Sequence, residues 1–288
     1  MIRKGIILAA GKGSRLSPIT KSVNKQLLPI YDKPLIFYPL SIFLQNKIRD
    51  ILIIVNKDQL KQFKKILPEK NNLGVKIKYK IQQKPKGLPD AFLIAQKFIN
   101  NENVALILGD NIFLNKNKSQ FFFNSPNILK GAKIFTYPVK LPKLFGVAKI
   151  DKNNKVLHIE EKPMKPKSNL AITGLYLFDK NVVKYSKSLK PSKRKELEIV
   201  DLLNIYKSSG NLKAQSLKKN IEWLDAGSED SLLLASNLIK KLDKKNIKIG
   251  YLEQISYKNK WINKNKVKKN IKYYGDCNYS NILKGFIR

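Results

Sequence analysis

Apolar residues in the first half of the chain gather in short runs, which alternate with segments of helical periodicity. A short continuous apolar run between turn residues is typical of a strand that is buried on both faces. We expect such strands at 5–9, 50–55, 75–81 and 104–108, and helices at 35–45, 58–66 and 89–98. Asp32 and Pro34 are expected to cap the first of these helices. This alternation predicts an α/β fold with a mainly parallel sheet flanked by helices.

The second half of the chain mixes the two patterns. We expect strands at 132–137, 147–150, 156–159 and 171–178, and helices at 198–208 and 228–242. Residues 151–154 (Asp-Lys-Asn-Asn) have the composition of a hairpin turn. The signals weaken from about residue 245, so we predict a main domain at 1–244 and a helical C-terminal appendage at 245–288.

The net charge of +36 would ordinarily suggest a nucleic acid or an anionic membrane as partner. However, only five of the 57 basic residues are Arg, the residue on which base and phosphate recognition chiefly depends. The lysines are scattered among Asn and Ile, without a nucleic-acid-binding motif. We therefore expect no dedicated nucleic-acid partner. A polyanion-binding module remains an alternative, and its binding would fall steeply with added salt.

Other features of the composition exclude several classes of protein. Cys277 and His158 are the only residues of their kinds, which excludes an intramolecular disulfide and a Cys/His zinc site. The longest apolar stretch, 35–44, contains Pro39 and is shorter than the about 20 residues of a membrane span. The N-terminus does not resemble a signal peptide. We expect a cytoplasmic protein with no membrane partner.

A glycine-containing loop follows the first expected strand and carries the first candidate chemistry. Gly11 and Gly13 would let backbone N–H groups approach a polyphosphate, and Arg15 would supply a fork of donors. Leu16 occupies the third-glycine position of a dinucleotide fingerprint, and no Gly-Lys-Ser/Thr closes a Walker A loop. Lys25 could meet the same phosphates. An ordinary strand–helix turn is the alternative.

Two acids stand at positions where a metal ion is a reasonable partner. Asp110 follows the buried strand 104–108, and Asp225 lies in the segment Trp-Leu-Asp-Ala-Gly-Ser at 223–228. A carboxylate at the end of a buried strand is costly unless it is paired, and Mg2+ favours one or two carboxylates together with water and phosphate. The alternative is that each acid caps a neighbouring turn.

Two further segments carry polar candidates. Gln82 and Gly87 lie in a Pro-stiffened connection, where an amide and exposed backbone could hold a base edge. Lys162 follows Glu161 directly after an expected strand and could bind a sugar phosphate. A stiff loop and a surface charge cluster are the corresponding alternatives.

Taken in order, these segments resemble the bacterial glucose-1-phosphate thymidylyltransferases, which belong to the sugar nucleotidyltransferases. The matching blocks include LAAGKGSRL (8–16), NKQLLPIYDKPLIFYPL (24–40), LGDNIF (108–113), EEKP (160–163) and EWLDAGS (222–228). The resemblance implies a Rossmann-like nucleotidyltransferase fold. It also implies Mg2+-dependent synthesis of dTDP-glucose and pyrophosphate from dTTP and glucose 1-phosphate, for dTDP-rhamnose and related deoxysugars.

The resemblance also assigns roles residue by residue. It implies that the nucleotide is held by Gly11, Gly13, Arg15, Lys25, Gln82 and Gly87. It implies that the sugar phosphate is held by Gly146, Glu161, Lys162 and Tyr176, and Mg2+ by Asp110 and Asp225. Arg15 and Lys162 are the residues implied to act directly in catalysis. A homotetramer is implied as well.

The chain departs from the family's usual pattern at several positions. Phe145 stands where a Tyr is common, and residues 114–116 and 218–220 lack the family's usual residues near its feedback site. We therefore expect catalysis to be retained and feedback inhibition by dTDP-rhamnose to be weakened. A UTP-dependent transferase on the same fold is the close alternative. A binding protein that keeps the site without turnover is another.

Overall fold

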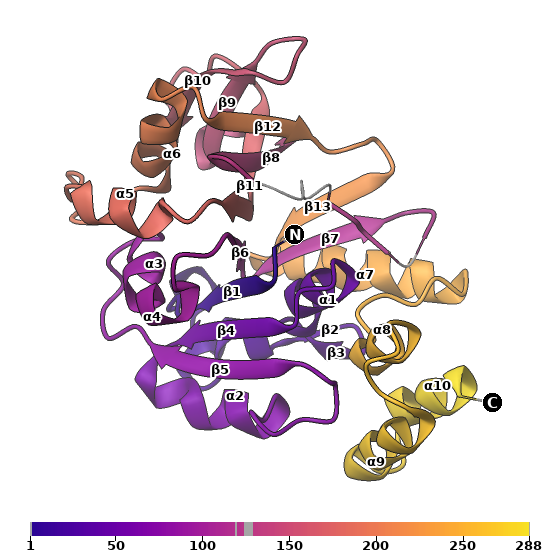
Figure 1. Cartoon of the computed structure of the whole chain (residues 1–288). Coiled ribbons are helices and arrows are strands. Elements are labelled where there is room, and N and C mark those ends of the chain that lie inside the picture. The colour runs from indigo at the N-terminus through magenta and orange to yellow at the C-terminus, as the bar shows by residue number, and fades with distance from the viewer. Residues whose placement is uncertain (1, 119, 124–128, 288) are drawn as a thin grey trace.

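A central sheet of nine strands organises the molecule in the computed structural model, which describes residues 2–118, 120–123 and 129–287 (Figure 1). Four strands from the first half pair in parallel: β1 (Lys4–Ala9), β4 (Asp50–Val55), β5 (Lys76–Ile81) and β6 (Val104–Leu108). The predicted α/β fold and all four of these predicted strands are confirmed. The near-continuous apolar sequences of β1, β4 and β6 reflect burial of both sheet faces, whereas β5 alternates lysine with apolar residues and is partly exposed.

The order of these strands determines where a ligand can bind. They lie in the order β5-β4-β1-β6, so the chain first builds outward from β1 to β5 and then returns to place β6 on the other side of β1. In open α/β sheets, ligands bind beyond the carboxyl ends of the strands at such a reversal. The glycine-containing loop leaves β1 there, and Asp110 follows β6 there.

The helices of the first half broadly follow the predicted positions. They are α1 (Phe37–Gln45), α2 (Leu60–Ile66), α3 (Asp90–Ile94) and α4 (Gln96–Ile99). The predicted helix 89–98 is interrupted at Ala95, whose backbone has left the helical region. The predicted helix cap at Asp32 is wrong. Its carboxylate is instead engaged by Lys33 and by the Tyr251 hydroxyl, and Lys33–Pro34 forms the short strand β3 against β2 (Pro29–Ile30).

The second half extends the same sheet with mostly antiparallel strands. β11 (Leu170–Phe178) pairs antiparallel with β6 and carries β9 (Gly146–Ile150) and β10 (Val156–Glu161) on one side. β8 (Ala132–Pro138) also pairs with β11, and β12 (Leu212–Ser216) pairs parallel with β8. The predicted hairpin turn lies between β9 and β10, where Asp151 Oδ1 accepts hydrogen bonds from the backbone N–H groups of Asn153 and Lys155.

A separate two-stranded ladder, not predicted from the sequence, lies beside the sheet. β7 (Asn111–Asn115) pairs antiparallel with β13 (Ile221–Asp225), and its register sets Asp225 opposite Asn111. This pairing brings two segments more than a hundred residues apart to the same end of β6. The remaining helices of this half are α5 (Val182–Ser188), α6 (Ile199–Ser208) and α7 (Glu229–Lys244), the last begun by a Ser228 capping box.

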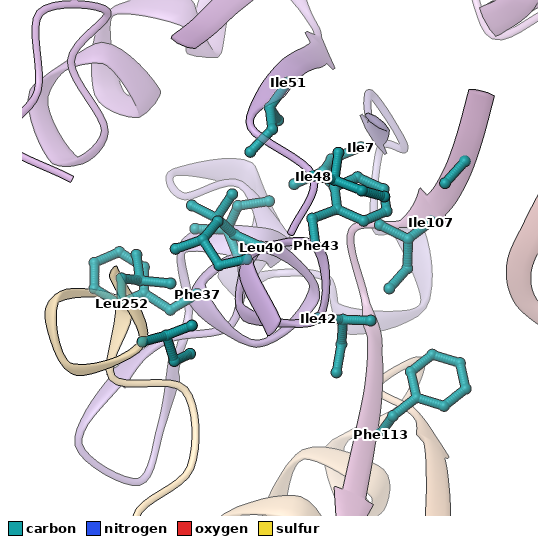
Figure 2. Packing of buried hydrophobic residues seen from close by; sticks show 14 of the residues in the cluster. Ile7, Phe37, Leu40, Ile42, Phe43, Ile48, Ile51, Ile107, Phe113 and Leu252 are labelled. Carbon is teal, nitrogen blue, oxygen red and sulfur yellow. The ribbon is translucent and has the colours of Figure 1, made fainter. Parts of the chain in front are cut away.

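Three helices follow residue 245, namely α8 (Leu252–Lys258), α9 (Lys264–Tyr274) and α10 (Asn278–Phe286). They share a hydrophobic cluster with α1 and the central sheet, and Figure 2 shows Leu252 beside Phe37. The Tyr279 and Phe37 rings meet edge to face, with centroids 6.3 Å apart. The predicted helical tail is present and packs against α1 and the central sheet, while the boundary at residue 244 stays a prediction.

In the described part of the chain, no helix combines the length and apolar character needed to cross a membrane.

Candidate functional site

A cavity of about 570 Å³ lies where the ends of β1 and β6 face the strands of the second half. Residues from both halves of the chain line it, and many of them are polar or charged. Eight of the predicted site residues line it: Arg15, Gly87, Asp110, Gly146, Glu161, Lys162, Tyr176 and Asp225. The structure therefore gathers in one place residues that the sequence spreads over more than 200 positions.

Asp110 and Asp225 form the acidic part of the cavity. Asp225 ends β13, and the backbone N–H of Ala226 donates to the Asp110 carbonyl at 3.0 Å, which joins the two segments. Burial raises the pKa of Asp225 from 3.8 to about 6, and repulsion from Asp110 adds to the shift. The positive charges of Lys25, Arg15 and Lys162 act in the opposite direction.

The two carboxylates suit a small, hard cation. Within the described ranges, no group of three or more Asp, Glu, His or Cys side chains is arranged to hold a metal ion. A pair of acids is nevertheless what Mg2+ commonly takes from a protein, since substrate phosphate and water complete its shell. Repulsion from Asp110 adds to the effect of burial on the pKa of Asp225. A divalent cation bound to both acids would relieve that repulsion.

Lys25 reaches the acidic pair through Asp110. It opens a short 3-10 helix, Lys25–Leu27, whose first turn is capped by Asn24, and its ammonium pairs with Asp110 Oδ2. The side chain is almost buried, with 8% of its area exposed. Lys25 is therefore positioned at the predicted metal carboxylate and does not itself line the cavity.

The loop after β1 is held in shape by its own contacts. Gly13 has a φ of +64°, and the Thr20 hydroxyl donates to its carbonyl at 2.8 Å. Arg15 follows in the 3-10 helix Ser14–Leu16 and lies against Gly227, where an added Cβ would stand 2.7 Å from the guanidinium. Gly11 has open space beside it. Neither Gly11 nor Gly13 lines the cavity, although both shape the loop that carries Arg15 into it.

Of the two residues predicted to hold the base, Gly87 lines the cavity and Gln82 does not. Gly87 lines the cavity in a left-handed conformation (φ +95°), and an added Cβ would lie 2.1 Å from the Leu197 carbonyl oxygen. Gln82 is buried at the end of β5 and donates to Asp90 Oδ2 at 2.8 Å. It does not line the cavity.

The opposite wall carries the residues predicted for the sugar phosphate. Gly146 leaves room for the Glu161 carboxylate, which would lie 3.1 Å from an added Cβ. Burial raises the pKa of Glu161, while Lys162 and Arg194 oppose the shift. Lys162 has a φ of +44°, rare for a residue with a side chain, and its N–H donates to the Phe145 carbonyl at 3.0 Å. Tyr176 is buried behind them.

Sequence reasoning missed six polar residues of the cavity: Asn111, Lys143, Arg194, Glu196, Glu198 and Trp223. Arg194 donates hydrogen bonds to the Glu198 carboxylate from Nε (3.1 Å) and from Nη2 (2.7 Å). Its Nη2 also lies 3.5 Å from a carboxylate oxygen of Glu161. Because the chain has only five Arg among 57 basic residues, each Arg could have been considered a candidate site residue, and Arg194 could have been predicted in this way. Asn111 and Trp223 gave no such signal, because their positions depend on the unpredicted pairing of β7 with β13.

A sequence profile of the nucleotidyl transferase family matches residues 4–241 of the chain. The match runs from β1 into α7 and so spans every element that lines the cavity. Together with a sheet whose ligand crevice lies at the ends of β1 and β6, it defines the class of protein as a nucleotidyl transferase.

Individual relatives narrow the class. The chain is 44% identical over 265 residues to the glucose-1-phosphate thymidylyltransferase of Neisseria meningitidis serogroup A, covering 92% of each chain. It is also 44% identical over 281 residues to the enzyme of that name from Neisseria gonorrhoeae, covering 97% of this chain and 98% of the relative. The chain therefore belongs to the nucleotidyl transferase family and, within it, to the glucose-1-phosphate thymidylyltransferases.

Solved structures agree with this placement. A Bacillus anthracis protein, described as a glucose-1-phosphate thymidylyltransferase and solved in complex with sucrose, superposes with a TM-score of 0.72 at 40% identity. That match covers 82% of this chain and 94% of the other. A UDP-glucose pyrophosphorylase in complex with UDP-glucose gives a TM-score of 0.70 at 26% identity, over 84% and 99% of the two chains.

Proposed function

We propose that this protein transfers a thymidylyl group from dTTP to glucose 1-phosphate, giving dTDP-glucose and pyrophosphate. A phosphate oxygen of glucose 1-phosphate forms a bond to the α-phosphorus of dTTP. The bond from that phosphorus to the bridging oxygen breaks, and pyrophosphate leaves with the oxygen. Neither a nucleophilic cysteine nor a catalytic histidine is required by this exchange.

One observation carries the proposal: a single cavity, lined by five acids and four basic residues, brings an acidic pair together with cations from segments on both sides of the sheet reversal. Asp110 and Asp225 lie there with Arg15, Lys162 and Arg194. Two like charges about 4 Å apart repel by about 4 kcal/mol at an effective dielectric of about 20. A site that brings two phosphate groups together needs cations placed in this way.

The position of each residue in the cavity indicates which substrate group it is suited to bind. Arg15, carried into the cavity by the loop after β1, is suited to hold the triphosphate. Lys162 and Arg194 stand on the opposite side, beside Glu161, and are suited to hold the sugar phosphate. Cations fixed on both sides of the reacting phosphorus stabilise the charge that gathers there in the transition state. Gly87 and Gln82 are proposed to contact the thymine, and Gly146, Glu161 and Tyr176 the glucose.

We infer that Asp110 and Asp225 hold a Mg2+ ion. Bound there, Mg2+ would supply positive charge that offsets the repulsion between the two phosphate groups. The protein's part is to bring both carboxylates into one cavity. The Lys25 ammonium supports this by pairing with Asp110.

The reaction is tested by pyrophosphate release from purified protein with Mg2+ and glucose 1-phosphate. Separate assays contain dTTP, UTP, CTP or ATP, each with and without EDTA. We expect turnover with dTTP that disappears in EDTA. Absence of turnover with every nucleotide, from protein shown to be folded by circular dichroism, would instead favour a binding protein without catalysis.

A uridylyltransferase is the second candidate, favoured by the likeness to a solved UDP-glucose pyrophosphorylase. The phosphate chemistry would be the same, and only contacts to the base would differ. Higher kcat/KM with UTP than with dTTP in the same assay would select it. The 44% identity to thymidylyltransferases, against 26% to the uridylyl enzyme, supports dTTP.

We further infer a cytoplasmic homotetramer that serves dTDP-rhamnose or related deoxysugar synthesis. Light scattering on the purified protein measures the assembly, and a mass of about four chains is expected. Weakened feedback inhibition also stays a prediction. Substituted residues bond to one another, since Asn220 Nδ2 donates to Asn115 Oδ1 at 3.1 Å and the Lys116 N–H donates to the Asn220 carbonyl at 2.9 Å.

A further inference from the structure

The side-chain amide of Asn111 connects three groups that frame the cavity. Asn111 begins β7, and only 2% of the residue is exposed. Its Oδ1 accepts from the Trp223 indole Nε1–H at 2.6 Å and from the backbone N–H of Gly174 at 2.9 Å. Its Nδ2 donates to Asp110 Oδ1 at 2.9 Å. The amide therefore links β13 and β11 to the carboxylate that follows β6.

These contacts leave the amide a single orientation. Only its oxygen can accept from two N–H donors, so the nitrogen must face Asp110. Gly174 closes the remaining space, because an added Cβ there would lie 2.6 Å from Asn111 Oδ1. The direction of the Asn111 amide is thus set by the protein before any ligand binds.

The Asp110 carboxylate is held through both of its oxygens, by partners of different character. Oδ2 pairs with Lys25, a charge on a flexible stem that can move toward an incoming phosphate. Oδ1 is held by the Asn111 amide, which its own contacts keep in place. The second contact therefore holds one oxygen of the carboxylate whatever Lys25 does.

We propose that Asn111 and Trp223 are positioning residues for the metal site. The indole N–H orients the Asn111 amide, and the amide orients Asp110 so that its free lone pairs meet the cation together with Asp225. Groups that orient metal ligands from behind typically change metal affinity by about 10- to 100-fold when removed. The inference deepens the proposed function and rests on it, since it takes Asp110 as a metal ligand.

Two substitutions separate this role from simple packing. Trp223→Phe removes the N–H donor and keeps an aromatic ring beside Phe145 and Tyr137, whose ring centroids lie 5.4 and 6.0 Å from that of Trp223. Asn111→Asp keeps the shape of the side chain but replaces the donor to Asp110 with an oxygen. Trp261→Phe, in the loop between α8 and α9, is the matched control for loss of an indole.

The experiment measures Mn2+ binding to the full chain without substrates, from the loss of the free-ion electron paramagnetic resonance signal. The Mg2+ concentration for half-maximal turnover is measured in parallel. We expect both constants to rise about tenfold or more in Trp223→Phe. In Asn111→Asp the lost donor and the added negative charge act in opposite directions on cation binding, so Trp223→Phe is the deciding variant. Trp261→Phe should match the wild type in both constants.

Failure of the inference differs from failure of the proposed function. A wild type that binds Mn2+ and turns over, with Trp223→Phe unchanged in both constants, overturns the positioning role alone. A wild type that neither binds Mn2+ nor turns over overturns the proposed function first. If Asn111→Asp does not fold, Trp223→Phe decides the question, because it changes one donor and keeps the ring.

Discussion

At the scale of single residues, the account assigns the chemistry to a few charged side chains. Asp110→Asn removes half of the charge of the proposed metal pair, and Lys162→Ala removes a cation from the sugar-phosphate side. We expect either change to lower kcat by at least about 100-fold, as for other lost electrostatic groups. Steady-state kinetics under saturating substrates make the measurement.

The matched control is Lys165→Ala, an exposed lysine three positions after Lys162 that does not line the cavity. Its kcat should stay within about twofold of the wild type, because an exposed charge outside the site contributes little. Near-wild-type turnover in Asp110→Asn or Lys162→Ala would contradict the residue assignment, whatever the control does.

Gly87 is expected to be required for the shape of the cavity wall. An added Cβ would lie 2.1 Å from the Leu197 carbonyl, in a backbone conformation (φ +95°) that disfavours side chains. Gly87→Ala should cost about 1–3 kcal/mol in the free energy of unfolding. Gly285→Ala, in α10 with open space around it, should be neutral or stabilising by up to about 1 kcal/mol. Equal urea midpoints for the two variants would refute the clash.

At the scale of elements, the C-terminal helices are held together by one buried carboxylate. Glu253 on α8 accepts from Tyr279 (2.7 Å), Tyr274 (2.9 Å) and Asn270 (3.1 Å), which belong to α9 and α10. Burial raises the pKa of Glu253 above 4.5, although these donors oppose the shift. The folded protein therefore binds this proton more tightly than the unfolded chain does.

A raised carboxyl pKa gives a defined pH dependence. The stabilisation is complete below 4.5, the ordinary pKa of the group, and is lost as the pH rises through the raised value in the folded protein. Relative to the wild type, Glu253→Gln should therefore gain stability between about pH 4.5 and about pH 7.5. Urea unfolding at the two pH values measures this. A difference between the two proteins that stays the same at both pH values would contradict it.

The strands and helices with strong local patterns could be predicted, whereas those that depend on distant pairing could not. β4 and β6 have the predicted bounds, since continuous apolar runs identify strands buried on both faces. β7 and β13 were missed because neither is a clean apolar run; each is stabilised by the other across the register from Ile221–Asn115 to Asp225–Asn111. The prediction that Asp32 caps a helix was wrong because its carboxylate accepts a hydrogen bond from the distant Tyr251 hydroxyl instead.

The candidate site was predictable to a similar degree. The motifs, taken in their order along the chain, predicted eight of the residues that line the cavity, including Arg15, Asp110 and Lys162. They could not place Lys25 on Asp110 or Gln82 on Asp90, because both contacts depend on how loops from separate strands meet. Asn111 was missed for the same reason as β13, since its partners Trp223 and Gly174 are more than 60 residues away.

At the scale of the whole molecule, the net charge of +36 should produce binding that is separate from catalysis. Affinity for a DNA oligonucleotide should fall at least about tenfold between about 50 and about 200 mM salt, because such binding is driven by counterion release. Turnover should change little over the same range. Fluorescence anisotropy and the pyrophosphate assay measure the two. DNA binding that resists salt would point to a dedicated nucleic-acid site.

The central claim is that one site joins the α-phosphorus of dTTP to glucose 1-phosphate in a single transfer. Its most direct test uses dTTP radiolabelled at the α-phosphorus, with enzyme in excess, Mg2+ and glucose 1-phosphate. The account predicts that the label moves into dTDP-glucose at the rate at which pyrophosphate appears, with none bound to denatured protein. Label retained on the protein, or dTTP consumed without labelled dTDP-glucose, would contradict it.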